Sequence, residues 1–143
     1  MRFWDSSAIV PLLLTEATTA AARSALDADR DVVVWWGTPT ECVSAIARLE
    51  REGVEGRAIQ AALRRLAAFQ GSWVEVEPSS TLREHATRLL RTHPLVAGDA
   101  LQLAAAITAA GGAPPELSFI TLDDRLLLAA DREGFPVIRF GIP

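Results

Sequence analysis

Short apolar segments rich in β-branched and aromatic residues recur along the chain, separated by longer stretches in which apolar and polar positions repeat at helical spacing. The apolar segments predict strands at residues 2–4, 32–36, 73–76, 117–120 and 137–140. The helical spacing is clearest in two sets of side chains, Ile59, Leu63, Leu66 and Phe69, and Leu82, Ala86, Leu89 and Leu90. Alternating strands and helices favour an α/β fold, a parallel sheet sandwiched between helices on both faces.

No linker, internal repeat or low-complexity tail interrupts this pattern, so we expect a single domain over residues 1–143. Two helix starts carry capping signals. Thr38 is the predicted N-cap of one helix, with Pro39 at its first position and Glu41 as the capping-box partner. Thr81 and Glu84 repeat the same pattern at a second helix.

Composition agrees with a folded protein, because 50% of the residues are hydrophobic and 22% are charged. The apolar runs are far shorter than the roughly 20 residues that a membrane span needs, so we expect no membrane segment. Asp5 stands where a secretion signal would need apolar residues, which predicts a cytoplasmic protein. The lone cysteine, Cys42, cannot form an intrachain disulfide and is expected to be a small buried side chain.

All fourteen basic residues are arginines, and the absence of lysine argues against a P-loop, a Schiff-base enzyme and a phospho-acceptor receiver domain. The net charge of −4 gives no global attraction to nucleic acid. Residues 57–91 are locally positive, however, with six arginines against three acids. This stretch is either an RNA-facing surface or an ordinary solvated helix face.

Ligands of such sheets bind beyond the carboxyl ends of the strands, and there the predicted polar residues are mostly acids. Asp5 ends the first strand, Glu41 lies in the first turn after the second, and Asp123 follows the strand that ends near Ile120. Asp99 differs, because it lies in a helix that is otherwise uncharged from residue 97 to residue 106. An ionised carboxylate that faces a core is costly unless it is paired, protonated or bound to a cation.

Each acid also has a purely structural explanation. Asp5 and Asp123 could cap the helices that follow them, and Glu41 could serve only the capping box. Asp99 could face solvent or pair with Arg88 or Arg91. Taken together, however, four carboxylates at one sheet edge repel one another. Mg²⁺ or Mn²⁺, which prefer oxygen ligands, would relieve that repulsion.

Four segments, in this order and at these intervals, resemble the PIN domain, and in particular the VapC-type toxins of toxin–antitoxin pairs: residues 3–10 (FWDSSAIV), 41–48 (ECVSAIAR), 99–104 (DALQLA) and 120–123 (ITLD). The resemblance spans nearly the whole chain. It implies a Mg²⁺-dependent ribonuclease, usually a homodimer, that a cognate antitoxin holds inactive.

Transferred to this sequence, the resemblance makes Asp5, Glu41, Asp99 and Asp123 the catalytic and metal-binding acids. It makes Ser7 and Thr121 the hydroxyl side chains that orient them. The four acids would hold the metal ions that activate water for attack on an RNA phosphodiester.

Several further residues have two interpretations each. Arg48, about 10 Å along the helix from Glu41, either contacts substrate phosphate or is a solvated arginine. Asp124 is interpreted as a helix-start acid rather than a ligand. The four tryptophans could stack bases, but their positions in strands favour core packing. We assign no role to Gln102, and no catalytic part to His85 or His93.

Two other functions compete with the ribonuclease. The chain could be a catalytically inactive PIN-like module that only binds protein partners. It could also be a metal-dependent phosphatase for small molecules. This is weaker because no second aspartate follows Asp5 two positions on, and no lysine is available to hold phosphate.

Overall fold

A computed structural model describes residues 1–140, and at its centre is a five-stranded sheet in which every pairing is parallel. The strands are β1 (Arg2–Trp4), β2 (Val32–Trp35), β3 (Val74–Val76), β4 (Ser118–Ile120) and β5 (Val137–Ile138). Their order in the sheet is β3-β2-β1-β4-β5. Each predicted strand is present, although most are shorter than predicted, and the α/β architecture is confirmed.

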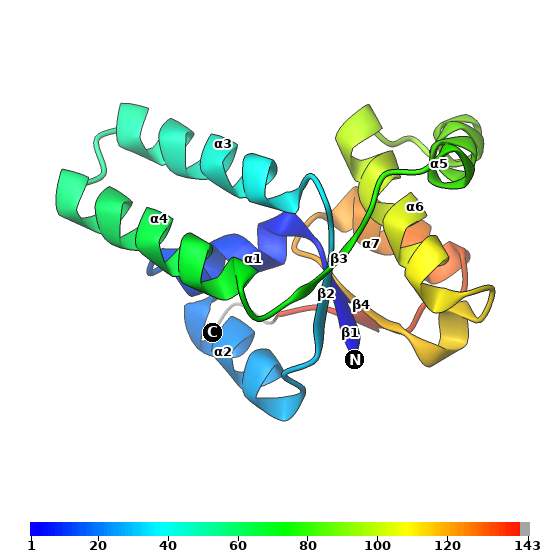
Figure 1. The fold of residues 1–143 in the computed structure, drawn as a ribbon, viewed down its shortest axis with the longest axis horizontal. Coiled ribbons are helices and arrows are strands. Elements are labelled where there is room, and N and C mark those ends of the chain that lie inside the picture. The colour runs from blue at the N-terminus through cyan, green and yellow to red at the C-terminus, as the bar shows by residue number, and fades with distance from the viewer. Residues whose placement is uncertain (141–143) are drawn as a thin grey trace.

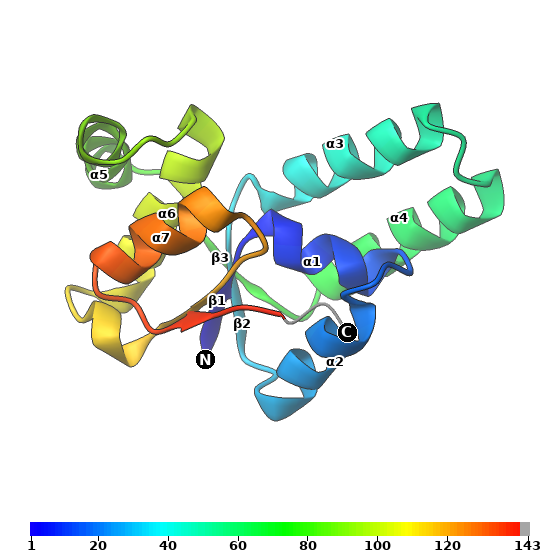
Figure 2. The same ribbon diagram turned by 180° about the vertical axis from the view of Figure 1, so that it is seen from behind.

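Helices cover both faces of the sheet (Figures 1 and 2). They are α1 (Ser6–Leu13), α2 (Thr19–Ala28), α3 (Thr38–Arg51), α4 (Gly56–Gln70), α5 (Ser80–Thr92), α6 (Ala97–Ala110) and α7 (Asp124–Arg132), with a short 3₁₀ helix at Pro114–Glu116. Figure 1 shows α1 to α4 on one side of the strands and α5 to α7 on the other. The turn between β2 and α3 lies between these two groups of helices (Figure 1).

Two hydrophobic cores, one on each face, hold these layers together. Side chains alternate along β2, so that Val32 and Val34 belong to the core under α1 to α4, while Val33 and Trp35 belong to the core under α5 to α7. All four are buried, as expected for a parallel strand with helices on both faces. Burial of each such side chain contributes about 1.5–3 kcal/mol of transfer free energy.

Both predicted helix starts differ from those in the structure, one because of a tertiary contact and the other because of a local cap. Gly37, not Thr38, is the residue before α3, and Thr38 lies inside the helix with its hydroxyl engaged elsewhere. Ser79, not Thr81, caps α5, because its Oγ accepts a hydrogen bond from the backbone N–H of Leu82 at 3.0 Å. Both capping boxes are therefore wrong in detail, although a helix follows in each case.

Two apolar side chains predicted for the core lie on the surface. Leu90 is 42% exposed on α5, because the buried face of that helix is already formed by its neighbours at helical spacing. Trp36 is 52% exposed just beyond β2, whereas Trp4, Trp35 and Trp73 are buried as predicted. β2 ends at Trp35, so the alternation that buries its side chains stops one residue earlier than predicted.

Within residues 1–140, no helix combines the length and the apolar character needed to cross a membrane.

The parallel sheet also determines where the candidate residues lie. Because all strands run the same way, their carboxyl ends share one edge, and α1, α3 and α7 begin there. In both views the first turns of these helices lie close together (Figures 1 and 2). Residues that follow β1, β2 and β4 are thus brought to one end of the molecule.

Candidate active site

Each of the four predicted acids lies at the N-terminal end of a helix. Asp5 and Asp123 are the N-caps of α1 and α7, with side-chain oxygens that accept from the N–H groups of Ser7 and Leu126. Glu41 and Asp99 lie in the first turns of α3 and α6. The partial positive charge at a helix N-terminus stabilises a carboxylate, so the helices offset some of the cost of bringing these acids together.

Asp5 is the most tightly held of the four, with a side chain that is buried inside the cluster. Its Oδ2 accepts hydrogen bonds from the hydroxyls of Ser7 and Thr121, the second at 2.9 Å. Ser7 Oγ in turn accepts from the backbone N–H of Leu122 at 2.9 Å. The hydroxyls singled out in the sequence thus join β1, α1 and the end of β4 and fix the orientation of the Asp5 carboxylate.

Glu41 is held by two side chains to which the sequence assigned no role. Its Oε2 accepts from Ser6 Oγ at 2.7 Å and from Gln102 Nε2 at 3.0 Å. Gln102 Nε2 also donates to Thr38 Oγ1 at 3.1 Å, so Glu41 and Thr38 share a donor instead of forming the predicted capping box. The available signal was the position of Gln102, a polar residue one turn after Asp99 in an apolar helix.

Asp99 shows that the acids act on one another. Burial first, and then the like charges of Asp123, Asp5 and Glu41, together raise its pKa to about 6, against an opposing effect of Arg125. The predicted alternative, an ion pair with Arg88 or Arg91, is wrong. Arg88 instead forms two hydrogen bonds with Glu133, at 2.9 and 3.0 Å.

Burial also raises the pKa of Asp5 and of Glu41, and the charge of Asp5 adds to the effect on Glu41. The thiol of Cys42, buried beside them, has a pKa of about 12, first because of burial and then because of the charges of Glu41 and Asp5. Cys42 is therefore an inert packing residue, as the sequence predicted. No salt bridge within residues 1–140 neutralises any of the four acids.

The donor set fits a hard divalent cation. The charged groups are all carboxylates, and Asp99 accepts no hydrogen bond from residues 1–140, so its oxygens are free to bind. As the side chains stand, no three acid, histidine or cysteine residues of the described chain are close enough to hold one ion. The four acids thus gather at one sheet edge, with Asp5 and Glu41 held by hydrogen bonds, but they do not form a ready-made three-ligand site among the described residues.

The other residues considered in the sequence differ in their position relative to the four acids. Asp124 is exposed and pairs with Arg139 at 2.6 Å, which agrees with a helix-start acid. His93 is buried, and its Nε2 lies 2.7 Å from Glu133 at the far ends of α5 and α7, away from the acids. Arg48 is exposed and lines a cleft together with Glu41.

The arginine-rich stretch of residues 57–91 does not form one RNA-facing surface. Its two helices, α4 and α5, pack in different cores on opposite faces of the sheet (Figure 1). Arg65 donates to the carbonyl oxygen of Leu13 at 2.8 Å, and Arg88 is paired with Glu133. These arginines therefore have structural partners that sequence proximity could not reveal.

Comparison with known proteins places this geometry in a wider group. The family described as PIN domain matches residues 2–132. A search of curated proteins finds no match. Similar solved structures include a toxin–antitoxin complex from Klebsiella pneumoniae, at 18% identity and a TM-score of 0.66, covering 96% of this chain and 96% of that one.

Two further structures are similar over nearly the same length. PAE2754 from Pyrobaculum aerophilum has 22% identity and a TM-score of 0.69, with 96% of this chain and 87% of that chain covered. A structure of FitAB bound to an IR36 DNA fragment has 18% identity and a TM-score of 0.66, with 97% and 94% covered. At these identities the similarity establishes a shared fold.

Proposed function

This chain belongs to the PIN domain family, and we propose that it is a ribonuclease that uses Mg²⁺ or Mn²⁺ held by Asp5, Glu41, Asp99 and Asp123. The observation that carries the proposal is that the four carboxylates gather at the N-terminal ends of helices at one edge of the sheet, and that no salt bridge among residues 1–140 pairs any of them. Burial and the neighbouring like charges raise the pKa of Asp99 accordingly. A bound ligand can offset the electrostatic free energy of gathering these carboxylates, and carboxylate oxygens are the ligands that hard divalent cations prefer.

When bound, such an ion supplies a water of lowered pKa and offsets charge on a phosphodiester. Hydrogen bonds from neighbouring residues hold the carboxylates that would bind the ion. Ser7 and Thr121 hold Asp5 in one orientation, and Ser6 and Gln102 do the same for Glu41. Because these donors are already in position, the carboxylates lose little conformational freedom when they bind.

Cleavage of RNA by the purified chain, with and without Mg²⁺ or Mn²⁺, tests this function. We expect metal-dependent cleavage that Asp5→Asn reduces at least about 100-fold, because an amide replaces a charged ligand. Asp131→Asn, in an exposed acid of α7 that lines neither cleft beside the acids, is the matched control and should retain activity. Absence of cleavage with either metal, together with intact partner binding by Asp5→Asn, would instead favour an inactive protein-binding module.

We also propose that the chain is the toxin of a toxin–antitoxin pair, acts in the cytoplasm as a homodimer and is inhibited by its antitoxin. Two structurally similar proteins support this: one was solved as a toxin–antitoxin complex, the other as FitAB on DNA. Induced expression of the wild-type chain should arrest growth, and Glu41→Gln should not. Molar mass in solution tests the dimer.

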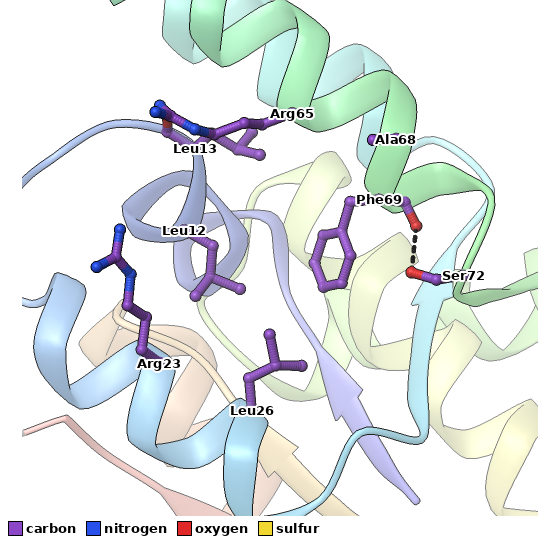
Figure 3. A pocket seen from close by; sticks show the side chains of 8 residues that line it. All are labelled: Leu12, Leu13, Arg23, Leu26, Arg65, Ala68, Phe69 and Ser72. Carbon is purple, nitrogen blue, oxygen red and sulfur yellow. Dashed lines mark hydrogen bonds between the residues drawn. The ribbon is translucent and has the colours of Figure 1, made fainter.

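An apolar groove away from the acids suits the antitoxin. It has a volume of about 390 Å³ and lies between α1, α2 and α4. Leu12, Leu26 and Phe69 point into it, while Arg23 and Arg65 lie at its edge (Figure 3). Arg65 is already bonded to a backbone carbonyl, which leaves Arg23 as the exposed cation.

The groove therefore fits an antitoxin segment with apolar side chains and an acidic residue placed for Arg23. The test is co-expression with the protein encoded beside this chain. Leu26→Arg should abolish the complex and leave RNA cleavage unchanged, whereas Leu128→Arg, on the exposed side of α7, should affect neither. A complex that survives Leu26→Arg would assign antitoxin binding to another surface.

A further inference from the structure

A cluster of three polar side chains joins the end of α5 to the end of α7. The carboxylate of Glu133 accepts two hydrogen bonds from the Arg88 guanidinium, at 2.9 and 3.0 Å, and its Oε1 also lies 2.7 Å from His93 Nε2. The hydrogen bonds from Arg88 hold the pKa of Glu133 below its ordinary 4.5, against the effect of burial, and His93 adds to the lowering. Glu133 is therefore ionised at neutral pH, and the Nε2–H of His93 donates to it.

This cluster is more buried than the other ion pairs of the protein. The side chains of His93 and Glu133 are 5% and 16% exposed, whereas both partners of each ion pair elsewhere in residues 1–140 are at least 26% exposed. A hydrogen bond to a charged group is stronger where water screens it less. The contact between His93 and Glu133 therefore fixes the end of α5 to α7 more firmly than an exposed pair would.

The segment that follows His93 has few other contacts to hold it. Only residues 94–96 lie between His93 and the start of α6. Helix α6 begins after Val96 without a side-chain cap, in contrast to α1, α5 and α7. Within residues 94–96 only Leu95 packs against a core, and the other two residues are exposed. The position of His93 therefore has a large effect on where the first turn of α6 lies.

The same segment and α7 form the two walls of a cleft of about 450 Å³, with Asp99 on one wall and Asp123 on the other. Burial and then the charge of Asp123 raise the pKa of Asp99, so the two carboxylates repel each other across the cleft. The nine residues of α7 span about 14 Å, and at their far end Glu133 meets His93. The cluster thus joins the walls at the end opposite to the acids and opposes their separation.

Building on the metal site proposed above, we propose that Glu133 and His93 are positioning residues that set the distance between Asp99 and Asp123. They act through the short segment that joins His93 to α6. With the contact in place, the two acids are held near each other before an ion binds, so that binding costs less conformational freedom. Without it, the first turn of α6 moves away from α7, and the affinity for the ion falls.

Amide hydrogen exchange of the metal-free protein tests the placement of α6. The N–H of Leu95 donates to the carbonyl oxygen of His93 at 2.9 Å. In the first turn of α6 the N–H of Ala100 donates to the carbonyl oxygen of Val96 at 3.0 Å. Glu133→Ala should accelerate exchange at both amides by at least about tenfold more than at the amides of the central strand β1, because it loosens this segment locally.

Calorimetric titration with Mn²⁺ tests the consequence for the site. Glu133→Ala and His93→Ala should each weaken binding by about tenfold or more, as expected for residues that orient ligands. The double variant should bind no more weakly than either single variant, because the two residues act through one contact. Glu133→Gln, which keeps an oxygen acceptor for His93, should have a smaller effect. Leu66→Ala is the control: it removes a buried side chain of the opposite core and should leave Mn²⁺ affinity unchanged.

Unchanged exchange at both amides in Glu133→Ala would overturn the positioning role, as would Mn²⁺ affinities in both single variants equal to that of the wild type. The result is separable from the proposed ribonuclease. If the wild type binds no Mn²⁺ and cuts no RNA, yet exchange depends on Glu133, the placement of α6 stands and the metal-dependent function fails. If the wild type binds Mn²⁺ and cuts RNA and both variants match it, the function stands and the positioning fails.

Discussion

Replacing Asp99 by asparagine tests the central physical feature of the site, the cost of a partly buried carboxylate among like charges. The change keeps the size of the side chain and removes its charge. In the folded protein the pKa of Asp99 rises from an ordinary 3.8 to about 6. The native state therefore binds a proton more tightly than the unfolded chain, and stability falls as the pH rises through that window.

The full shift corresponds to about 3 kcal/mol at 1.36 kcal/mol for each pH unit. Asp99 is only partly buried, and water screens its interactions, so we expect about 1–2 kcal/mol. In EDTA at about pH 7.5, Asp99→Asn should thus be more stable than the wild type by this amount. At about pH 4, where the Asp99 carboxyl is largely protonated in the native state, the difference should become small.

Metal should reverse the order of stability. An ion present at about 100 times its Kd adds about 2.7 kcal/mol to the wild type, and Asp99→Asn should gain less because it has lost a ligand. Urea unfolding followed by tryptophan fluorescence, with EDTA and with Mn²⁺, measures all four values. Asp124→Asn is the control and should change stability by no more than about 0.5 kcal/mol. If Asp99→Asn is no more stable than the wild type in EDTA, neither burial nor the neighbouring acids destabilise the Asp99 carboxylate, and the reasoning fails.

Three other changes probe the structure around the site. Gln102→Leu should weaken Mn²⁺ binding about 10–100-fold, measured by calorimetry, because Glu41 loses its amide donor; unchanged affinity would make that contact irrelevant. Leu103→Ala removes a fully buried side chain of α6 and should lower the free energy of urea unfolding by about 2–5 kcal/mol, so a loss below 1 kcal/mol would contradict the packing. Glu133→Gln weakens the pair with Arg88 and should cost about 1 kcal/mol near neutral pH. Because that pair lowers the pKa of Glu133 below its ordinary 4.5, its contribution is present at neutral pH and disappears as the pH falls through the lowered pKa, and a cost that persists in stronger acid would refute the charge pairing.

Local sequence was sufficient for the layers of the fold. A strand such as β2 is recognisable because it is a short run of β-branched and aromatic residues, and all four of its residues are buried between the two layers of helices. Asp5, Glu41 and Asp123 were also accessible from the sequence, because parallel strands place whatever follows them at one edge. Asp99, which follows a helix, stood out as the one charge in an apolar helical stretch. Asp5 and Asp123 are, in addition, the helix caps that their positions suggested.

Only the tertiary structure decided how the acids are supported. Glu41 is bonded to Gln102, 61 residues away, and Asp5 to Thr121, 116 residues away. Thr38 has the composition of an N-cap but lies inside its helix, because Gln102 provides a buried donor for its hydroxyl. Periodicity and capping signals arise from neighbours within about four residues, whereas a side-chain hydrogen bond depends on which helices pack together. For that reason the sequence determined the kind of fold and the identity of the acids, and packing alone determined their partners.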